Sequence, residues 1–249
     1  MSTELKYLED TYLYTFDTEL IGVDKDENGE YVVFLETIFY PQGGGQESDT
    51  GTITVTSADG HDAQFQVTFV KFVNGQVRHY GNFGDLMGVN INGSGVSIEL
   101  NAERRLRNAK LHSAGHLVAS IVEQLDNRLR ANKGFHFSQG SYVNFEILDK
   151  HDFDKEAVLD QLNAKIVADI DENLPVSSEI VSYEVLKERC AYIPGYLPKD
   201  KPLRVVTMGA YEPIPCGGTH IDSLEKLRGL VVSKAKKKGG DIRISYSVN

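Results

Sequence analysis

Hydrophobic and polar residues alternate over most of the first hundred positions, as in strands that bury one face. Three turn dipeptides separate these stretches: Asn28-Gly29, Asp59-Gly60 and Asn74-Gly75, of which the first and third are strong hairpin signals. Many short strands with few helices predict a small closed or partly closed β domain. The expected strands are 12–23, 31–37, 51–57, 63–73, 76–81 and 95–100.

A different period begins near residue 101. From Glu103 to Leu125, apolar residues recur at helical spacing without a proline, which predicts an amphipathic helix. A second helix is expected to begin with Asp154 as its N-cap and to end before Pro175. The change of period predicts an α+β protein with a β-rich domain at 1–100 and a mixed domain at 101–249. The other elements expected in the second part are a hairpin within 134–146, strands at 176–182 and 203–208, a short helix at 183–189, and strands 229–236 and 242–248 joined by a turn at 239–241.

Two motifs each place a pair of metal-binding side chains four residues apart, His112 with His116 and Cys216 with His220. Positions i and i+4 share one face of a helix, so the first pair can converge on one ion. Cys216 follows a Pro-Ile-Pro segment and precedes two glycines, so it is expected on a turn that lets Cys216 and His220 face the same point. Three imidazoles and one thiolate suit Zn²⁺. The sequence therefore predicts one zinc site that the fold assembles from distant segments.

The motifs leave the role of this ion open between structure and hydrolysis. Ser113 follows His112, so the general-base glutamate of the zinc-protease motif is absent. With four protein ligands a tetrahedral site is full, and catalysis would need five-coordination, the loss of one ligand, or an ion that only positions the substrate. His136 is a candidate base, although a histidine between two phenylalanines is more typical of a packed side chain.

The formal net charge of −10 at pH 7 argues against unspecific binding of nucleic acid. The basic residues are nevertheless clustered, and two clusters in an acidic chain indicate local binding of an anionic substrate, although either cluster alone is typical of a solvated face. One cluster is Arg104, Arg105, Arg107 and Lys110, and the other is Lys234, Lys236, Lys237 and Lys238.

The expected cellular location rests on the absence of membrane-spanning and signal-peptide patterns in the sequence. No apolar run approaches the ~18–20 residues needed to cross a bilayer, and the polar start of the chain does not resemble a signal peptide. Two cysteines, Cys190 and Cys216, do not make a disulfide framework, and a metal-bound thiolate suits a reducing compartment. We therefore expect a cytoplasmic protein with no membrane partner.

The segment 39–51 interrupts the strand pattern with three consecutive glycines, Gly43, Gly44 and Gly45, which Gln46 follows. Such a segment can bring backbone close to a ligand or can simply be a flexible loop. It is neither a P-loop nor a dinucleotide-binding fingerprint.

Together these motifs resemble the AlaX-type alanyl-tRNA editing proteins, which are stand-alone homologues of the editing domain of alanyl-tRNA synthetase. The resemblance spans about residues 35 to 245, and no aminoacylation domain accompanies it. The residues that carry it are Pro41-x-Gly-Gly-Gly-Gln46-x-x-Asp49-x-Gly51, Arg104-Arg105 before His112-x-x-x-His116, and Cys216-Gly-Gly-Thr-His220.

The resemblance implies a small β-barrel-like domain followed by a zinc-containing α+β editing domain that acts on tRNA in trans. It implies zinc ligation by His112, His116, Cys216 and His220, and a place for Gly43–Gln46 in the substrate region. Nucleotide and ATP binding are expected from the family alone, and no stable protein partner is implied. With tRNA as substrate, the basic clusters gain a role, and phosphate contacts are expected from Arg104, Arg105, Lys234, Lys236, Lys237 and Lys238.

The expected substrate is Ser-tRNA(Ala), with Gly-tRNA(Ala) as a second candidate. A synthetase pocket for alanine rejects an amino acid with one extra hydroxyl by only about 10²-fold, so a second, hydrolytic site is needed. That site must hydrogen-bond the serine hydroxyl, and the candidates are Ser138, Gln139, Ser141 and Thr219, each of which can also be an ordinary loop residue. Two alternatives stay open: a Ser-tRNA(Thr) deacylase of the threonyl-tRNA synthetase editing type, which the glycine segment disfavours, and a non-catalytic RNA-binding protein stabilised by zinc.

Overall fold

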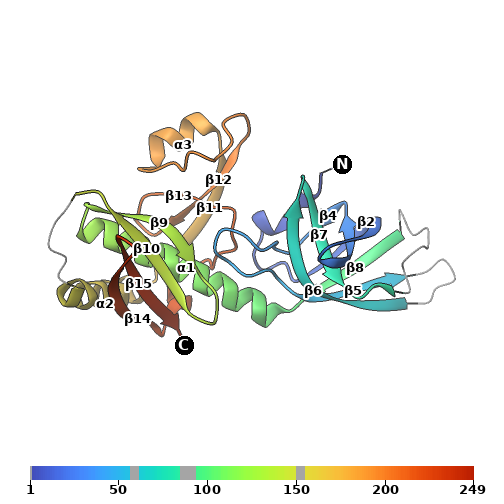
Figure 1. Cartoon of the computed structure of the whole chain (residues 1–249), viewed down its shortest axis with the longest axis horizontal. Coiled ribbons are helices and arrows are strands. Elements are labelled where there is room, and N and C mark those ends of the chain that lie inside the picture. The colour runs from blue at the N-terminus through green and yellow to red at the C-terminus, as the bar shows by residue number, and fades with distance from the viewer. Residues whose placement is uncertain (1, 57–61, 85–93, 150–154) are drawn as a thin grey trace. The chain divides into compact units, whose positions relative to one another are not determined.

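A computed structural model of the chain describes residues 2–56, 62–84, 94–149 and 155–249. The expected turn at Asp59-Gly60 and the expected N-cap Asp154 lie outside these residues. The chain forms two compact units, Met1–Arg107 and Asn108–Asn249 (Figure 1). Both α-helices and β-strands are present, as the α+β prediction requires.

The first unit is built on a closed barrel in which every neighbouring pair of strands is antiparallel, in the order β2-β3-β7-β6-β5-β8. Closure leaves no unpaired sheet edge, which confirms the expected closed β unit. A short parallel pair, β1 (Glu4–Leu5) with β4 (Glu36–Thr37), and a 3-10 helix η1 (Lys6–Leu8) lie beside it. The barrel strands are β2 (Thr15–Asp26), β3 (Gly29–Phe34), β5 (Gly51–Thr56), β6 (Asp62–Val73), β7 (Gln76–Gly81) and β8 (Ser94–Leu100).

Both strong hairpin signals mark real hairpins. Asn74 and Gly75 join β6 to β7 with φ of 50° and 84°, the positive values that a type I′ turn requires at both central positions. The first hairpin is displaced by one residue, because its two-residue loop is Glu27 and Asn28, while Gly29 with φ of 118° already pairs in β3.

The barrel interior holds a buried imidazole among apolar side chains. His79 Nδ1 lies 3.1 Å from the Val32 carbonyl and must donate to it, so Nε2 accepts the Thr37 hydroxyl at 2.8 Å. Burial lowers the pKa of His79 to about 3, so the ring is neutral near pH 7. The surrounding core includes Leu20, Val32, Phe34, Ile38, Phe39, Ile53, Val70, Val77, Phe83 and Ile98.

The second unit packs helices on one face of a four-stranded antiparallel sheet of order β14-β15-β10-β9. The expected hairpin within 134–146 is the β9–β10 pair, and the expected turn near 239 joins β14 to β15. The strands are β9 (Leu129–Phe135), β10 (Ser141–Ile147), β14 (Leu230–Lys238) and β15 (Asp241–Val248). A three-stranded sheet contains β11 (Val176–Val181), β12 (Leu203–Met208) and β13 (Ile214–Pro215), and α3 (Tyr183–Arg189) packs against it. The 3-10 helix η3 (Leu224–Leu227) contacts α2.

Helices α1 (Ala102–Leu125) and α2 (Lys155–Asp171) match the two long helices expected from the sequence. Asn101 caps α1, because its Oδ1 accepts the N–H of Arg104 at 2.9 Å. Leu117 and Ile121 of α1 share a core with Val143 and Phe145 of β10, which fixes the rotation of the helix and therefore the direction of its histidines. None of the helices in the described ranges is both long enough and apolar enough to span a membrane.

Candidate metal centre

Four side chains from two distant segments of the second unit converge on one point. His112 and His116 lie one turn apart on α1, while Cys216 and His220 come from the loop after β13, outside any helix or strand. Their donor atoms all lie within 4.8 Å of one another. The structure therefore brings together the four residues that the two motifs single out.

The spacing of the donor atoms suits a tetrahedral ion. Cys216 Sγ lies 3.6 Å from His112 Nε2 and 3.3 Å from His220 Nε2. Bonds of about 2.3 Å to sulfur and about 2.0 Å to nitrogen would set such atoms roughly 3.5 Å apart. The buried Nδ1 of His116 has no hydrogen-bond partner within the described part of the chain, and a cation gives an otherwise unsatisfied buried nitrogen a partner. The residues present therefore fit one zinc ion.

The protonation of the three imidazoles also suits a metal. Burial lowers the pKa of His116 to about 4 and holds the pKa of His112 and His220 well below the usual value, since the nearby rings and Arg204 further disfavour added positive charge. All three rings are thus neutral at pH 7, the form that binds metal. Burial raises the pKa of the Cys216 thiol. The Gly218 N–H, which donates to Sγ at 3.3 Å, lowers this pKa and partly offsets the effect of burial.

Ser113 connects the helix to the loop. Its Oγ accepts the Ile221 N–H at 3.2 Å and lies 3.0 Å from His220 Nδ1. When His220 offers Nε2 to a metal, Nδ1 carries the proton and donates to Ser113, which fixes the tautomer and the ring orientation. Sequence reasoning gave Ser113 no such role, although a small hydroxyl residue inside the histidine motif was the available signal.

Arg204 shapes the cysteine loop from β12. Its Nη1 donates to the carbonyls of Gly218 at 2.8 Å and Cys216 at 3.3 Å, and its own carbonyl accepts the Cys216 N–H at 3.0 Å. These bonds hold the loop in the curl that aims Cys216 and His220 at one point. Nothing in the local sequence of a strand marks such an arginine, so sequence reasoning missed this residue.

His136 follows β9 and lies against the cluster. Its ring stacks on His112 with centroids 4.7 Å apart and planes at 20°. A Cβ atom on Gly115 or on Gly134 would approach a His136 ring atom to 2.2 Å, so the ring occupies a slot that two glycines leave open. The structure thus shows the packed histidine that its neighbours in sequence suggested.

The hydrogen bonds of His136 define its tautomer. Tyr246 donates its hydroxyl to the Leu111 carbonyl at 2.9 Å, so His136 Nδ1, 2.6 Å from the same oxygen, must be the donor in that contact. Nε2 then carries the lone pair, and burial lowers the pKa of His136 to about 3, so the ring stays neutral. A role for His136 as general base stays a prediction.

The glycine segment forms a tight loop on the barrel unit. Gly44 and Gly45 adopt φ of 53° and 77°, a region that glycine favours. The loop is closed at its base, where Asp49 Oδ2 accepts the Tyr40 N–H at 2.6 Å and the Asp49 N–H donates to the Tyr40 carbonyl at 3.1 Å. Gly43 and Gly44 are exposed while Gln46 is fully buried. Their expected place in the substrate region stays a prediction.

Arg105 corrects the expectation of a phosphate contact. Its side chain is 0% exposed and forms an ion pair with Asp49 at 2.5 Å. The guanidinium also donates to the Thr11 carbonyl at 2.9 Å and to the Ile38 carbonyl. A buried cation with its donors taken by protein acceptors cannot reach tRNA, so Arg105 is a structural residue of the glycine loop.

The other cations expected at tRNA differ in exposure. Arg104 is partly exposed, and its Nε donates to the Ser48 carbonyl at 2.8 Å. The four lysines of the second cluster are exposed along β14. They are Lys234, Lys236, Lys237 and Lys238.

The candidate partners for a serine hydroxyl have different environments. Ser138 and Gln139 are in the loop between β9 and β10, where both are exposed. Ser141 is buried and donates to the Phe137 carbonyl at 3.0 Å, and Thr219 is fully buried beside His220. Their roles stay predictions.

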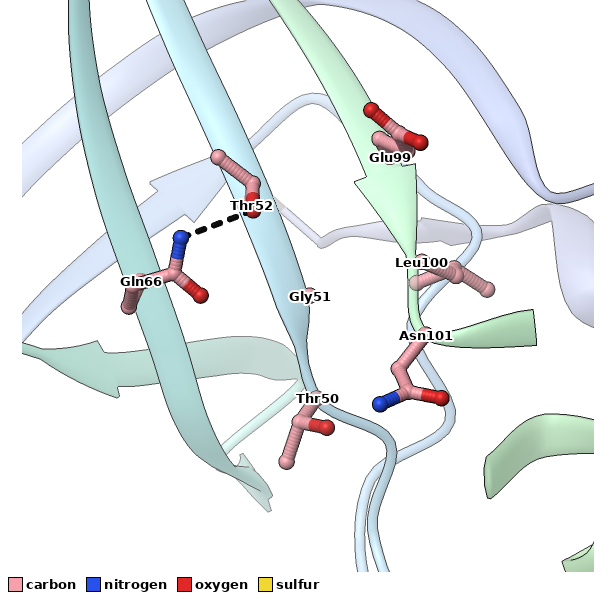
Figure 2. Close-up of a pocket in the computed structure, with 7 residues that line it drawn as sticks. All are labelled: Thr50, Gly51, Thr52, Gln66, Glu99, Leu100 and Asn101. Atoms are coloured by element: carbon pink, nitrogen blue, oxygen red, sulfur yellow. Dashed lines mark hydrogen bonds between the residues drawn. The ribbon is translucent and has the colours of Figure 1, made fainter. Parts of the chain in front are cut away.

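A polar hollow of about 280 Å³ lies on the barrel unit, where Figure 2 shows Gln66 donating to Thr52 at 2.8 Å. Gly51 is one of the lining residues. A Cβ atom on Gly51 would lie 2.4 Å from the Glu99 carbonyl oxygen, so only glycine allows β5 to approach β8 this closely. The lining offers one carboxylate and no histidine or cysteine, and we assign it no chemistry.

Comparison with known proteins gives consistent relatives. No family model matches the chain. The alanyl-tRNA editing protein AlaX-M of Methanosarcina acetivorans is 30% identical over 259 residues, which cover 98% of each chain. AlaX-M of Methanosarcina mazei is 30% identical over 252 residues, covering 98% of this chain and 95% of the relative. AlaX-M of Methanosarcina barkeri is 29% identical over 253 residues, again 98% of each.

Proposed function

Because the chain belongs to the family of AlaX alanyl-tRNA editing proteins, we propose that it hydrolyses wrongly acylated tRNA(Ala) in trans. The observation that carries this proposal is the convergence of His112, His116, Cys216 and His220 within 4.8 Å. The match to AlaX-M of Methanosarcina acetivorans over 98% of each chain also supports this proposal.

The residues of the centre would hold one zinc ion, with His112, His116, Cys216 and His220 as ligands. Zinc supplies a Lewis acid for an ester carbonyl and lowers the pKa of a bound water. Burial keeps the imidazoles neutral and available, while Ser113 orients the His220 ring through Nδ1. Arg204 fixes the loop that carries Cys216.

Serine on tRNA(Ala) is the proposed substrate, with glycine second. A hydroxyl-binding site can discriminate by about 10⁴-fold against an analogue that lacks the hydroxyl, which spares correctly charged Ala-tRNA(Ala). Thr219 immediately precedes His220. Ser138 and Gln139 lie in the loop that follows His136, and Ser141 is the first residue of β10 after that loop. We keep all four as candidates for the hydroxyl contact.

Contacts to tRNA phosphates are proposed for Arg104, Lys234, Lys236, Lys237 and Lys238. All except Arg104 are exposed, and Arg104 is partly exposed. Phosphate contacts make affinity depend on salt, and removing one phosphate-binding cation lowers the slope of that dependence by about one.

The test is hydrolysis of purified Ser-, Gly- and Ala-tRNA(Ala) and of Ser-tRNA(Thr) by the full chain. We expect Ser-tRNA(Ala) to be deacylated fastest and Ala-tRNA(Ala) to survive. Faster hydrolysis of Ser-tRNA(Thr) would favour the threonine system instead. Binding of tRNA without hydrolysis of any substrate would favour the non-catalytic alternative.

A further inference from the structure

The four-stranded sheet of the second unit has one face in the core and an opposite face that carries aromatic rings and cations. The core face includes Val143, Phe145, Ile242 and Ile244, and side chains alternate along a strand, so their neighbours point the other way. Strand register arranges these neighbours in two rows across the sheet. The first row is Phe135, Tyr142, Ser245 and Lys234, and the second row is Lys133, Asn144, Arg243 and Lys236. We name these two rows, together with Phe137, the aromatic–basic face.

The flat groups of the aromatic–basic face stack on one another. The rings of Phe135 and Phe137 are 4.3 Å apart with planes at 14°, and those of Phe135 and Tyr142 are 5.2 Å apart at 16°. The Arg243 guanidinium lies 3.6 Å from the centre of the Tyr142 ring, and its Nε donates to Asn144 Oδ1 at 2.9 Å. All three rings are partly exposed. The result is a pre-ordered stack of planar groups at the protein surface.

The cations beside this stack are available. Lys133, Lys234 and Lys236 are exposed, and none of them forms an ion pair with a carboxylate in the described ranges. Two acidic residues on the same face pair in register with cations: Asp241 lies opposite Lys238 and Glu146 lies opposite Arg130. A positive surface in a chain of net charge −10 favours a polyanionic ligand.

The combination of stacked planes and free cations indicates the class of polyanion. Unpaired bases stack on aromatic rings and on arginine planes, while lysines hold the phosphates between them. A duplex buries the faces of its bases and offers no comparable stacking partner. We propose that the aromatic–basic face binds unpaired nucleotides of an RNA strand. The bases stack on Phe137, Phe135 and the Arg243–Tyr142 pair, and the phosphates contact Lys133, Lys234 and Lys236.

The position of His136 connects this face with the metal centre. His136 contacts His112 and Tyr246 on the core side, whereas Phe135 and Phe137, its neighbours in sequence, contact each other. One short segment therefore contributes to the centre on one side of the sheet and to the stack on the other. That the bound strand is the unpaired end of the substrate tRNA rests on the proposed function, while the stacking itself does not.

The experiment uses the full chain and a short single-stranded RNA that carries one 2-aminopurine, a base whose fluorescence falls when it stacks. Wild-type protein is expected to bind and to quench the probe. Phe137→Leu and Tyr142→Leu keep apolar bulk but remove the aromatic plane, so each is expected to weaken binding by roughly fivefold or more and to reduce quenching. Tyr196→Leu is the matched control, because Tyr196 is 85% exposed and lies outside the face.

A second pair of variants guards against misfolding. Lys234→Gln and Lys236→Gln alter exposed side chains, and each is expected to reduce the salt slope of single-strand binding by roughly 0.7, because it removes one cation from the phosphates. Lys71→Gln, an exposed lysine of β6, is expected to leave the slope unchanged.

The proposal is overturned if the folded aromatic variants bind and quench like wild type, or if the same sequence as a duplex binds equally well. It is also overturned if the face joins two copies of the chain, which sedimentation would reveal as a dimer that Phe137→Leu dissociates. Deacylation of Ser-tRNA(Ala) by the same preparations separates the two proposals. Quenching without hydrolysis refutes the function and keeps the face, whereas hydrolysis with unaltered variant binding refutes the face alone.

Discussion

Ser113 shows how one hydroxyl supports a site to which it donates no ligand. It receives the Ile221 N–H and faces Nδ1 of His220 at 3.0 Å. The four candidate ligands could be found in the sequence, because imidazole and thiolate at a spacing of four residues indicate metal chemistry on their own. Ser113 left only the weak signal of a small hydroxyl residue inside the histidine motif, and Arg204 left none, because the fold alone brings Ser113 to His220 and Arg204 to the cysteine loop.

Ser113→Ala is expected to weaken zinc binding by roughly 10- to 100-fold, the usual cost of removing a group that orients a histidine ligand. Competition with a chelator of known affinity measures this. Ser120→Ala, a partly buried serine of the same helix, should leave the affinity unchanged. Equal affinities in both variants and the wild type would show that Ser113 does not orient His220.

At the scale of elements, strand and helix positions were largely predictable because alternation and helical period are properties of contiguous residues. The two-residue strands β1 and β13 were not, since so few residues carry no period, whereas β4 lies at the end of the expected strand 31–37. The end of β2 was placed three residues early because Asp24, Lys25 and Asp26 are polar and break the alternation, although they pair with β3. Arg105 was wrongly expected at the surface because an arginine within a basic run is typical of a solvated face, and its partner Asp49 lies far back in the chain.

Arg105→Ala should destabilise the protein by about 3–5 kcal/mol, because it leaves Asp49 as a buried charge without its partner. Arg107→Ala changes an exposed arginine of the same helix and should have little effect. Urea unfolding followed by circular dichroism gives the comparison. Similar midpoints for the two variants would contradict the structural role of the Asp49–Arg105 pair.

His79 makes the barrel sensitive to acid. Its folded pKa of about 3 lies below the unfolded value of about 6.5, so the unfolded chain takes up the proton first. Its contribution to stability is complete above about pH 6.5 and is lost as the pH falls toward 3, by about 1.4 kcal/mol per pH unit. Between these pH values, His79→Gln should lower the slope of the unfolding free energy against pH by the amount that corresponds to about one bound proton. An unchanged slope would show that His79 is not buried as a neutral ring.

At the scale of the whole molecule, the candidate centre depends on long-range folding. Residues about a hundred positions apart supply the two halves of the donor set, so the centre cannot form in a local segment as in a zinc finger. The sequence therefore predicted which residues meet but not what surrounds them. The packed His136 and the aromatic–basic face depend on the pairing of β9, β10, β14 and β15 (Figure 1), and the curled cysteine loop depends on Arg204 of β12.

The most direct test combines zinc content with hydrolysis of Ser-tRNA(Ala) in one series of preparations: wild type, chelator-treated wild type, zinc-restored protein, His116→Ala and Cys216→Ala. We predict one zinc ion per chain in the wild type. The treated protein and both variants should lose zinc and hydrolysis together while circular dichroism shows a retained fold. Hydrolysis should recover only when zinc is returned to the wild type. Full hydrolysis by a folded, metal-free preparation would contradict the account.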